Sequence, residues 1–209
     1  MELEENLKSA LTELRKEKAR KFDQSLDLVL NLQKFDVKKN QVNIFVSVPH
    51  KIKDKRIAAF LDSRRNDVET ITKDDFKKYS DKKEIRKLLK KFDFFIASAN
   101  LMANVATTFG RYLGPAGKMP SPQLGILTDV NDKSISEIKN KINNSVKIRT
   151  KEASVKMSVG KQSMKDEEII ENIVAVYNAM LKALPQEKDN IRNLEIKFTM
   201  SKPVKIKTK

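Results

Sequence analysis

The chain has 209 residues, enough for one or two domains, and a formal net charge of +15 from 43 lysines and arginines against 28 aspartates and glutamates. That excess favours a polyanionic partner, with nucleic acid ranked ahead of an anionic membrane surface. An inert lysine-rich surface would give the same net charge. The chain has no cysteine and a single histidine, so we expect no disulfide, metal, cofactor or catalytic residue. It also has no apolar run of membrane-spanning length, and we expect a cytoplasmic protein.

The first fifty residues predict one helix and two strands. Leucine and alanine recur at helical spacing from Glu2 to Arg20, with acids in the first turn and basic residues in the last, where the helix dipole favours them. From Lys21 the period changes to two, and the leucines from 26 to 32 share one face, which is typical of a half-buried strand. A second such strand covers 42–48, and the short polar turn before it predicts that the two strands pair antiparallel.

A different pattern begins at Lys55. Two runs, Ile57–Leu61 and Phe94–Ala97, are continuously apolar, as in strands of a parallel sheet that is buried on both faces. Helical patterns at 73–91, 100–113 and 133–144 provide the covering layers. We therefore predict an inserted three-layer α/β domain of Rossmann-like layering at 55–147, without the Gly-x-Gly-x-x-Gly turn of dinucleotide binders.

Alternation returns after residue 150. A strand at 153–159 is followed by a helix that the capping box Ser163-x-x-Asp166 opens and Pro185 stops, and a last strand covers 194–201. Neither end of the chain can fold alone, so 1–54 and 148–209 are predicted to form one split α+β domain, with a four-stranded, mainly antiparallel sheet and two helices on one face. Chain crossings near 49–54 and 147–150 predict a hinge.

The stretch from Phe109 to Gly125 holds four of the five glycines and three of the prolines, which predicts an irregular loop with a positive face. It does not fit a phosphate-binding P-loop, because Tyr112 stands where that motif needs its first glycine and Met119 where it needs a hydroxyl. Its Leu-Gly-Pro-x-Gly-Lys-Met-Pro order resembles the signature of the archaeal-type large-subunit ribosomal "L-one" proteins of the mobile stalk. The signature positions, which either shape the sheet edge or touch RNA or tRNA, are Gly110, Arg111, Gly114, Pro115, Gly117, Lys118, Met119 and Pro120.

The uncovered face of the split domain is expected to be polar. Its outward positions are Ser25, Asp27, Ser154, Lys156, Ser158, Lys197, Thr199 and Ser201. Short hydroxyls and lysines on a flat sheet suit phosphates and ribose hydroxyls, although the solvated face of an ordinary sheet is an equally open alternative. Phe22 and Met200 fall on the alternate positions that point inward in their predicted strands. We therefore expect core packing as their first role and RNA contact as the second.

The resemblance covers this domain as well. The start Lys21-Phe-Asp-Gln-Ser25, the turn Val159-Gly-Lys161 and the end Thr199-Met-Ser201 resemble the RNA-binding segments of the family, with Ser201 in place of a usual glycine. Residues assigned to RNA by pattern or resemblance are Lys21, Phe22, Ser25, Asp27, Lys156, Ser158, Gly160, Lys161, Thr199, Met200 and Ser201.

The resemblance implies a protein that is a monomer when free, binds large-subunit ribosomal RNA in the mobile stalk and helps release deacylated tRNA from the exit site. It also implies translational repression through binding of its own messenger RNA. The alternative is a small α/β enzyme that acts on a phosphorylated substrate near residues 114–118. Its candidate carboxylate pairs, Asp74-Asp75 and Glu167-Glu168, each open a predicted helix and are explained by the helix dipole. No basic-and-aromatic amphipathic helix is recognised, so no membrane partner is expected.

Overall fold

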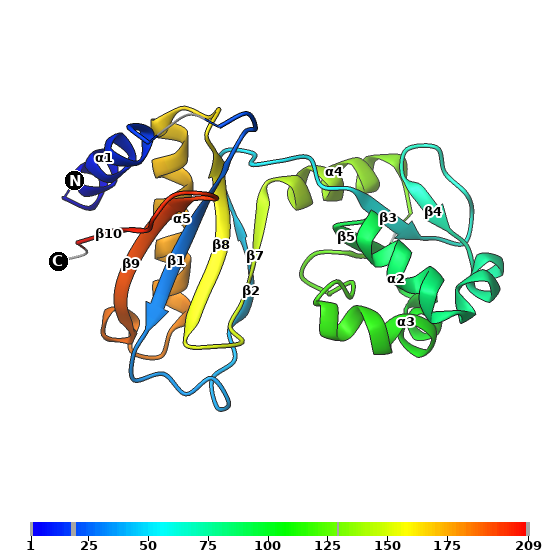
Figure 1. Cartoon of the computed structure of the whole chain (residues 1–209). Helices are drawn as coiled ribbons and strands as arrows, with labels where there is room; N and C mark the ends of the chain where they lie inside the picture. Colours follow the sequence, from blue (N-terminus) through cyan, green and yellow to red (C-terminus); the bar gives the residue numbers. More distant parts are fainter. Residues whose placement is uncertain (1, 18–19, 129, 208–209) are drawn as a thin grey trace. The chain divides into compact units, whose positions relative to one another are not determined.

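The structure, a computed structural model, describes residues 2–17, 20–128 and 130–207. These residues divide into two compact units, one that runs up to Ile52 and resumes at Asn144, and one of residues 53–143 (Figure 1). The expected boundaries, 54/55 and 147/148, lie a few residues from these. The described residues form three sheets, with strand orders β10-β9-β1-β8, β2-β7 and β4-β3-β5-β6, so the fold is mixed α/β.

The elements of each unit follow in chain order. Unit 1 contains α1 (Glu2–Arg15), β1 (Ser25–Leu32), β2 (Asn43–Ser47), β7 (Ser145–Arg149), β8 (Ser154–Lys161), α5 (Asp166–Ala183), the 3-10 helix η3 (Glu187–Asn190), β9 (Ile191–Phe198) and β10 (Val204–Ile206). Unit 2 contains β3 (Ile57–Phe60), β4 (Glu69–Ile71), η1 (Lys73–Ser80), α2 (Lys82–Lys91), β5 (Phe94–Ser98), η2 (Ala99–Leu101), α3 (Met102–Ala116), β6 (Ile126–Leu127) and α4 (Asp132–Asn143). The first helix thus ends at Arg15 rather than Arg20, and the first strand begins at Ser25 rather than Lys21.

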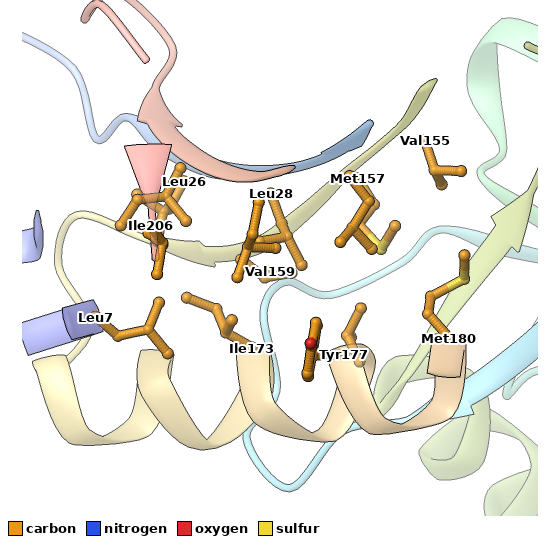
Figure 2. Close-up of a cluster of buried hydrophobic side chains, with 14 of the residues drawn as sticks. Leu7, Leu26, Leu28, Val155, Met157, Val159, Ile173, Tyr177, Met180 and Ile206 are labelled. Carbon is orange, nitrogen blue, oxygen red and sulfur yellow. The ribbon is translucent and has the colours of Figure 1, made fainter. Parts of the chain in front are cut away.

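One face of the four-stranded sheet packs on α1 and α5. The four leucines of β1 are buried, and the residues between them are only partly buried on the other face. Figure 2 shows Leu26 and Leu28 pointing toward Ile173 and Tyr177 of α5, with Leu7 of α1 at one end of the same cluster. Burying a leucine side chain contributes about 1.5–3 kcal/mol, so the alternation determines which face of the sheet stays open.

The predicted pairing of the first two strands is wrong. β1 lies between β8 and β9 and pairs antiparallel with both, whereas β2 pairs with β7 in a separate two-stranded sheet. The fourth strand of the main sheet is β10, in the lysine-rich end for which we predicted no element. Alternation over only Val204, Lys205 and Ile206 is too short to indicate a strand.

Unit 2 contains the parallel sheet that its apolar runs predict. Every residue of β3 and β5 is buried, and β3 pairs in parallel with both β4 and β5. Phe60 and Phe95 of this sheet belong to one cluster with buried residues of α2 and α3. In Figure 1, α4 lies on the opposite side of the sheet from α2 and α3. The prediction of a parallel sheet is confirmed.

The glycine- and proline-rich stretch is helical as far as Ala116, which corrects the prediction of an irregular loop for its first part. Helix α3 runs through Gly110, Gly114 and Pro115, and ends at Gly117 with a left-handed φ of 69°. Glycine adopts this conformation without steric cost, so Gly117 is the residue that stops the helix. Residues Phe109 and Leu113 of α3 are fully buried, and this tertiary packing outweighs the weak helix propensity of the stretch.

Candidate nucleic-acid interface

The open face of the main sheet carries three rows of side chains across β8, β1 and β9. The register gives the rows Ser158-Asp27-Lys197, Lys156-Val29-Glu195 and Ser154-Asn31-Asn193. We call these nine residues the polar face. Directly opposite residues of neighbouring strands have Cβ atoms about 4.5–5.5 Å apart, so each row acts as one contact unit. A shallow depression of about 450 Å³ lies here, lined by residues of all three rows and by Pro203.

The polar face is balanced in charge rather than cationic. Lys156 and Lys197 are matched by Asp27 and Glu195, two carboxylates of which the sequence analysis assigned only the first. Burial raises the pKa of the Asp27 carboxyl above its ordinary value, although Lys197 directly opposite favours the charged form. The face therefore offers oriented cations beside acceptors, and not a uniform positive surface.

Two polar atoms of the third row lack a hydrogen-bond partner within the described residues. These are the Ser154 Oγ and the Asn193 Oδ1, both buried. Leaving such an atom unsatisfied costs about 1–3 kcal/mol. Because both atoms are closed to solvent, a polar ligand on this face can bind them only after rotation of the two side chains.

The end of the sheet where β1 begins is built from three loops, 21–25, 161–163 and 199–201, which we call the loop cluster. Gln24, which is 5% exposed, joins them. Its side chain donates to Gln162 Oε1 (3.2 Å) and accepts from the Met200 N–H (3.1 Å), and its carbonyl accepts from the Gln162 N–H (2.8 Å). Gln24 could not be identified from the sequence, because nothing there distinguishes a buried glutamine from the outward polar residues beside it.

Lys161 and Thr199 lie in the loop cluster and already have partners. The Lys161 ammonium lies 3.6 Å from Asp23, whose carboxylate also accepts from the Ser163 N–H (3.1 Å) and hydroxyl (3.0 Å). The Thr199 hydroxyl donates to the Ser25 carbonyl at 3.3 Å, as its N–H does at 3.1 Å. Both residues thus connect segments that are far apart in the sequence.

Phe22 and Met200 are exposed, which corrects the expectation that they pack in the core. Their exposed fractions are 52% and 58%, and no other large hydrophobic among the described residues is exposed. Alternation does not reach either residue, because β1 begins only at Ser25 and β9 ends at Phe198. Phe22 lies two residues before Gln24, and the Met200 N–H donates to the Gln24 side chain. Lys21, next to Phe22, is also exposed.

Ser201 and Gly160 were predicted to face RNA, and the structure places both inside. The Ser201 hydroxyl accepts from the Phe198 N–H at 2.8 Å and closes the turn after β9, so the residue is only 9% exposed. Ser201 has no left-handed φ, and serine is therefore unstrained at a position where the family usually has glycine. Gly160 is buried, and a Cβ there would lie 3.0 Å from Ile169 Cγ1. On the polar face, by contrast, Ser158 donates to the Leu26 carbonyl at 3.4 Å.

Several residues of the signature stretch pack or form hydrogen bonds inside unit 2. Lys118 Nζ donates to the carbonyls of Leu89 and Phe92, each at 2.7 Å, and so caps the end of α2. Burial lowers the pKa of this lysine. Met119 packs against the unit 2 core, Pro120 is buried, and the remaining signature residue with a charge, Arg111, is exposed. The expected positive face is thereby reduced to one side chain.

One carboxylate of each pair considered for catalysis, Asp75 or Glu168, caps a helix. Hydrogen bonds from Lys78 and Thr72 hold the pKa of Asp75 well below its usual range, and the Thr72 N–H and hydroxyl donate at 3.3 and 2.9 Å. Glu168 accepts from the Lys165 N–H at 3.3 Å, so α5 begins after Lys165 and not after Ser163 as predicted. Both observations agree with the explanation from helix-end electrostatics.

Taken with the fold, these contacts define a mixed α/β protein with an open polar sheet face and a loop cluster at its end. Within the described ranges, no three His, Cys, Asp or Glu side chains gather to hold a metal ion. Nor is any described helix long and apolar enough to cross a membrane.

Comparison with known proteins gives the family. The sequence model of the Ribosomal protein L1p/L10e family matches residues 14–202, and the chain belongs to this family. It is similar to "Large ribosomal subunit protein uL1" of Pyrococcus horikoshii, 34% identical over 90% of this chain and 89% of the relative. The proteins of the same name are 35% identical in Pyrobaculum islandicum (91% and 88% covered) and in Thermoplasma acidophilum (97% and 96%). Family membership makes the chain a structural ribosomal protein and not an enzyme.

Proposed function

We propose that the chain is a constituent of the large ribosomal subunit that binds large-subunit ribosomal RNA through the polar face and the loop cluster. The relatives are named as large-subunit proteins. The observation that carries the RNA assignment is the register, which aligns lysines, carboxylates and unsatisfied amide and hydroxyl groups in three parallel rows. Such mixed rows suit ribose hydroxyls and phosphates on a folded RNA better than a uniform charge does.

Each part of the site has a distinct task. Lys156 and Lys197 contact phosphates, and the Asp27 carboxylate, directly opposite Lys197 on the neighbouring strand, attracts the Lys197 ammonium. Ser154 and Asn193, whose oxygens lack a partner within the described residues, supply hydrogen bonds to ribose or base edges once their side chains rotate toward the RNA. The apolar side chains of the loop cluster pack on a base or ribose.

The same binding gives the protein its wider role. Bound to ribosomal RNA, it forms the mobile stalk and assists the release of deacylated tRNA from the exit site. A similar RNA structure in its own messenger would compete for the same face, and translation would fall when free protein, a monomer, accumulates. These roles follow from the family resemblance and from one shared RNA site.

The proposed hinge has an anchor in each unit. On the unit 1 side, the backbone of His50 is held by Asn172 of α5. On the unit 2 side, Lys55 donates from its N–H to Asn143 Oδ1 (3.1 Å) and from Nζ to the Ile142 carbonyl (2.6 Å). The chain crosses at 52/53 and again at 143/144, just before β7. Fixed anchors on both sides would confine bending to these few residues.

Binding to a large-subunit stalk RNA, compared with an unrelated hairpin over a series of salt concentrations, tests the RNA site. Charge attraction falls steeply with salt for both RNAs, whereas a shape-matched site keeps its preference for the stalk RNA. Lys156→Gln and Ser158→Ala should reduce the preference, while Lys151→Gln, an exposed lysine in the turn before β8, should retain it. Equal binding of both RNAs that disappears with salt would contradict the proposal.

A further inference from the structure

A dense group of cations lies on α2 and the end of η1, in the unit that does not contain the polar face. Residues 77–91 hold eight lysines and arginines against two carboxylates, whereas the remainder of unit 2 holds eleven against ten. We call the eight the basic strip: Lys77, Lys78, Lys82, Lys83, Arg86, Lys87, Lys90 and Lys91. All eight are exposed, so nearly the whole net charge of the unit lies in the accessible side chains of this one segment.

The helix places six of these cations in two parallel rows. Lys82, Arg86 and Lys90 recur at every fourth residue, and Lys83, Lys87 and Lys91 do the same. Residues four apart on a helix are neighbours, and like charges at this spacing are unfavourable. Lysines in the first turn also oppose the helix dipole. Of these cations only Lys90 and Lys91, in the last turn, are favoured by the helix dipole, so the stability of α2 does not explain the rest of the arrangement.

Within the described residues the second row is partly paired and the first is not. Lys87 lies 2.7 Å from Glu84, and Lys91 2.5 Å from Glu69. No described carboxylate lies within ion-pair distance of Lys82, Arg86 or Lys90. That row consequently keeps its full charge toward solvent.

The other side of α2 shows which kind of partner the strip can accept. Ile85, Leu88 and the following Phe92 are buried in the unit 2 core. A membrane-surface helix needs an accessible apolar side, and α2 has none to offer. The described part of the strip also presents no exposed aromatic side chain on which single-stranded bases could stack. Regular cations without apolar contact suit a repeating line of phosphates.

We infer that the basic strip is a second RNA-binding surface, which docks on the phosphate backbone of an RNA duplex without reading its sequence. Lys82 to Lys90 spans about 12 Å of helix with cations about 6 Å apart. Each strand of duplex DNA presents a phosphate about every 3.4 Å along the axis, and the phosphates of an RNA duplex are no further apart along it, so the row spans at least about three phosphates. The surface belongs to unit 2 and does not require that the polar face bind RNA.

The test uses the full chain and a 16-base-pair RNA duplex of arbitrary sequence, with affinity measured from low to high salt. The triple variant K82Q/R86Q/K90Q should bind at least about tenfold more weakly at low salt, and its salt slope should fall by about three because three phosphate contacts are lost. The matched control K133Q/K139Q/K141Q removes three exposed lysines from α4 of the same unit. It should stay within about twofold of the unchanged chain.

Other results would overturn the inference. Equal losses in both triples would mean that total charge and not the strip attracts the duplex, and no loss in either would exclude a strip contact. A loss of binding to poly-glutamate or to phosphatidylserine vesicles larger than the loss for the duplex would assign the strip to another partner. Failure of the polar face is separable, since it appears as equal affinity for stalk RNA and hairpin in the unchanged chain.

Discussion

The fully buried side-chain amide of Asn172 binds both backbone polar groups of His50. Its Oδ1 accepts from the His50 N–H at 3.0 Å, and its Nδ2 donates at 3.0 Å to the carbonyls of His50 and Val159. The His50 ring adds a contact of 2.8 Å between its Nε2 and Glu171 Oε2. One residue of α5 therefore ties the departing chain to strand β8, immediately before the first crossing between the units.

Removing this amide should be costly. Asn172→Ala leaves the N–H and carbonyl of His50 and the carbonyl of Val159 to find new partners, and we expect a loss of about 2–4 kcal/mol in the free energy of unfolding. Urea denaturation measures the loss, and Asn178→Ala, an exposed asparagine on the same helix, is the control. Similar stability of the two variants would show that His50 is not anchored in this way.

Gly160 is expected to affect stability before it affects RNA binding. In Gly160→Ala the new methyl group would lie 3.0 Å from Ile169 Cγ1, and overpacking of this kind costs about 1–3 kcal/mol. Thermal unfolding of Gly160→Ala, of Ile169→Ala and of the double variant forms a cycle. The double variant should lose less than the two single losses combined, because the truncated side chain makes room. If the double variant lost as much stability as the two single variants combined, the Gly160→Ala methyl group would not be strained against Ile169.

The end of β9 shows why some site residues could not be predicted. Alternation from Leu194 continues in the sequence through Ser201, but the strand stops at Phe198. The Ser201 N–H donates to the Phe198 carbonyl at 3.1 Å, and the turn exchanges inward and outward positions, so that Met200 is exposed and Ser201 is buried. Periodicity predicts faces only while the backbone stays extended.

The central strand shows what could be predicted. The alternation of β1 correctly assigns Leu28 to the core and Asp27 to the open face, since a strand of eight residues offers four repeats of the pattern. The strands that pair with β1 could not be derived from the sequence. A strand shows the same alternation whether its partner is the next strand in the chain or one about 130 residues away. The row that joins Asp27 to Ser158 and Lys197 therefore required the three-dimensional structure.

Replacement of Asp27 should separate stability from binding. Its pKa is raised by burial above the ordinary 3.8, so at pH 7 the folded state bears a charge penalty that is absent below pH 3.8, where the carboxyl is neutral in both states. Asp27→Asn should therefore be more stable than the unchanged chain at pH 7, with the difference lost on acidification to pH 3.

Chemical denaturation at the two pH values measures the effect of Asp27→Asn, and Glu152→Gln, in the exposed turn before β8, is the control. The same Asp27 variant should lose preference for stalk RNA, because Lys197 loses its oriented neighbour. A destabilised variant at pH 7 would mean that the pairing with Lys197 outweighs burial.

Lys55 should make stability depend on alkaline pH. Burial, reinforced by Lys53 and opposed by Asp93, lowers its pKa from 10.5 to about 8. Between these values the unfolded chain holds a proton that the folded chain has lost, so stability rises with pH across this window. Below pH 8 the group is charged in both states and the slope vanishes.

The slope from Lys55 is isolated by comparison with Lys55→Met, measured by denaturation at intervals from pH 7 to pH 10.5. The unchanged chain should gain stability relative to the variant as the pH rises through this range. The loss of the hydrogen bond to Ile142 shifts the variant equally at every pH and does not affect the comparison. Parallel curves would show that the Lys55 pKa is not lowered.

Phe22 and Met200 provide the sharpest test of the loop cluster as a binding surface, because their exposure separates folding from recognition. Both are more than half exposed, so Phe22→Ser and Met200→Ser should change the free energy of unfolding by less than about 0.5 kcal/mol. Stacking of the Phe22 ring on a base contributes about 1–3 kcal/mol, so Phe22→Ser should bind stalk RNA about 5 to 150 times more weakly, and Met200→Ser should also lose affinity. Val37→Ser, in the turn that follows β1 at the far end of the sheet, should leave affinity unchanged. Variants that unfold more easily would return Phe22 and Met200 to a packing role, and stable variants with full RNA affinity would remove the loop cluster from the interface.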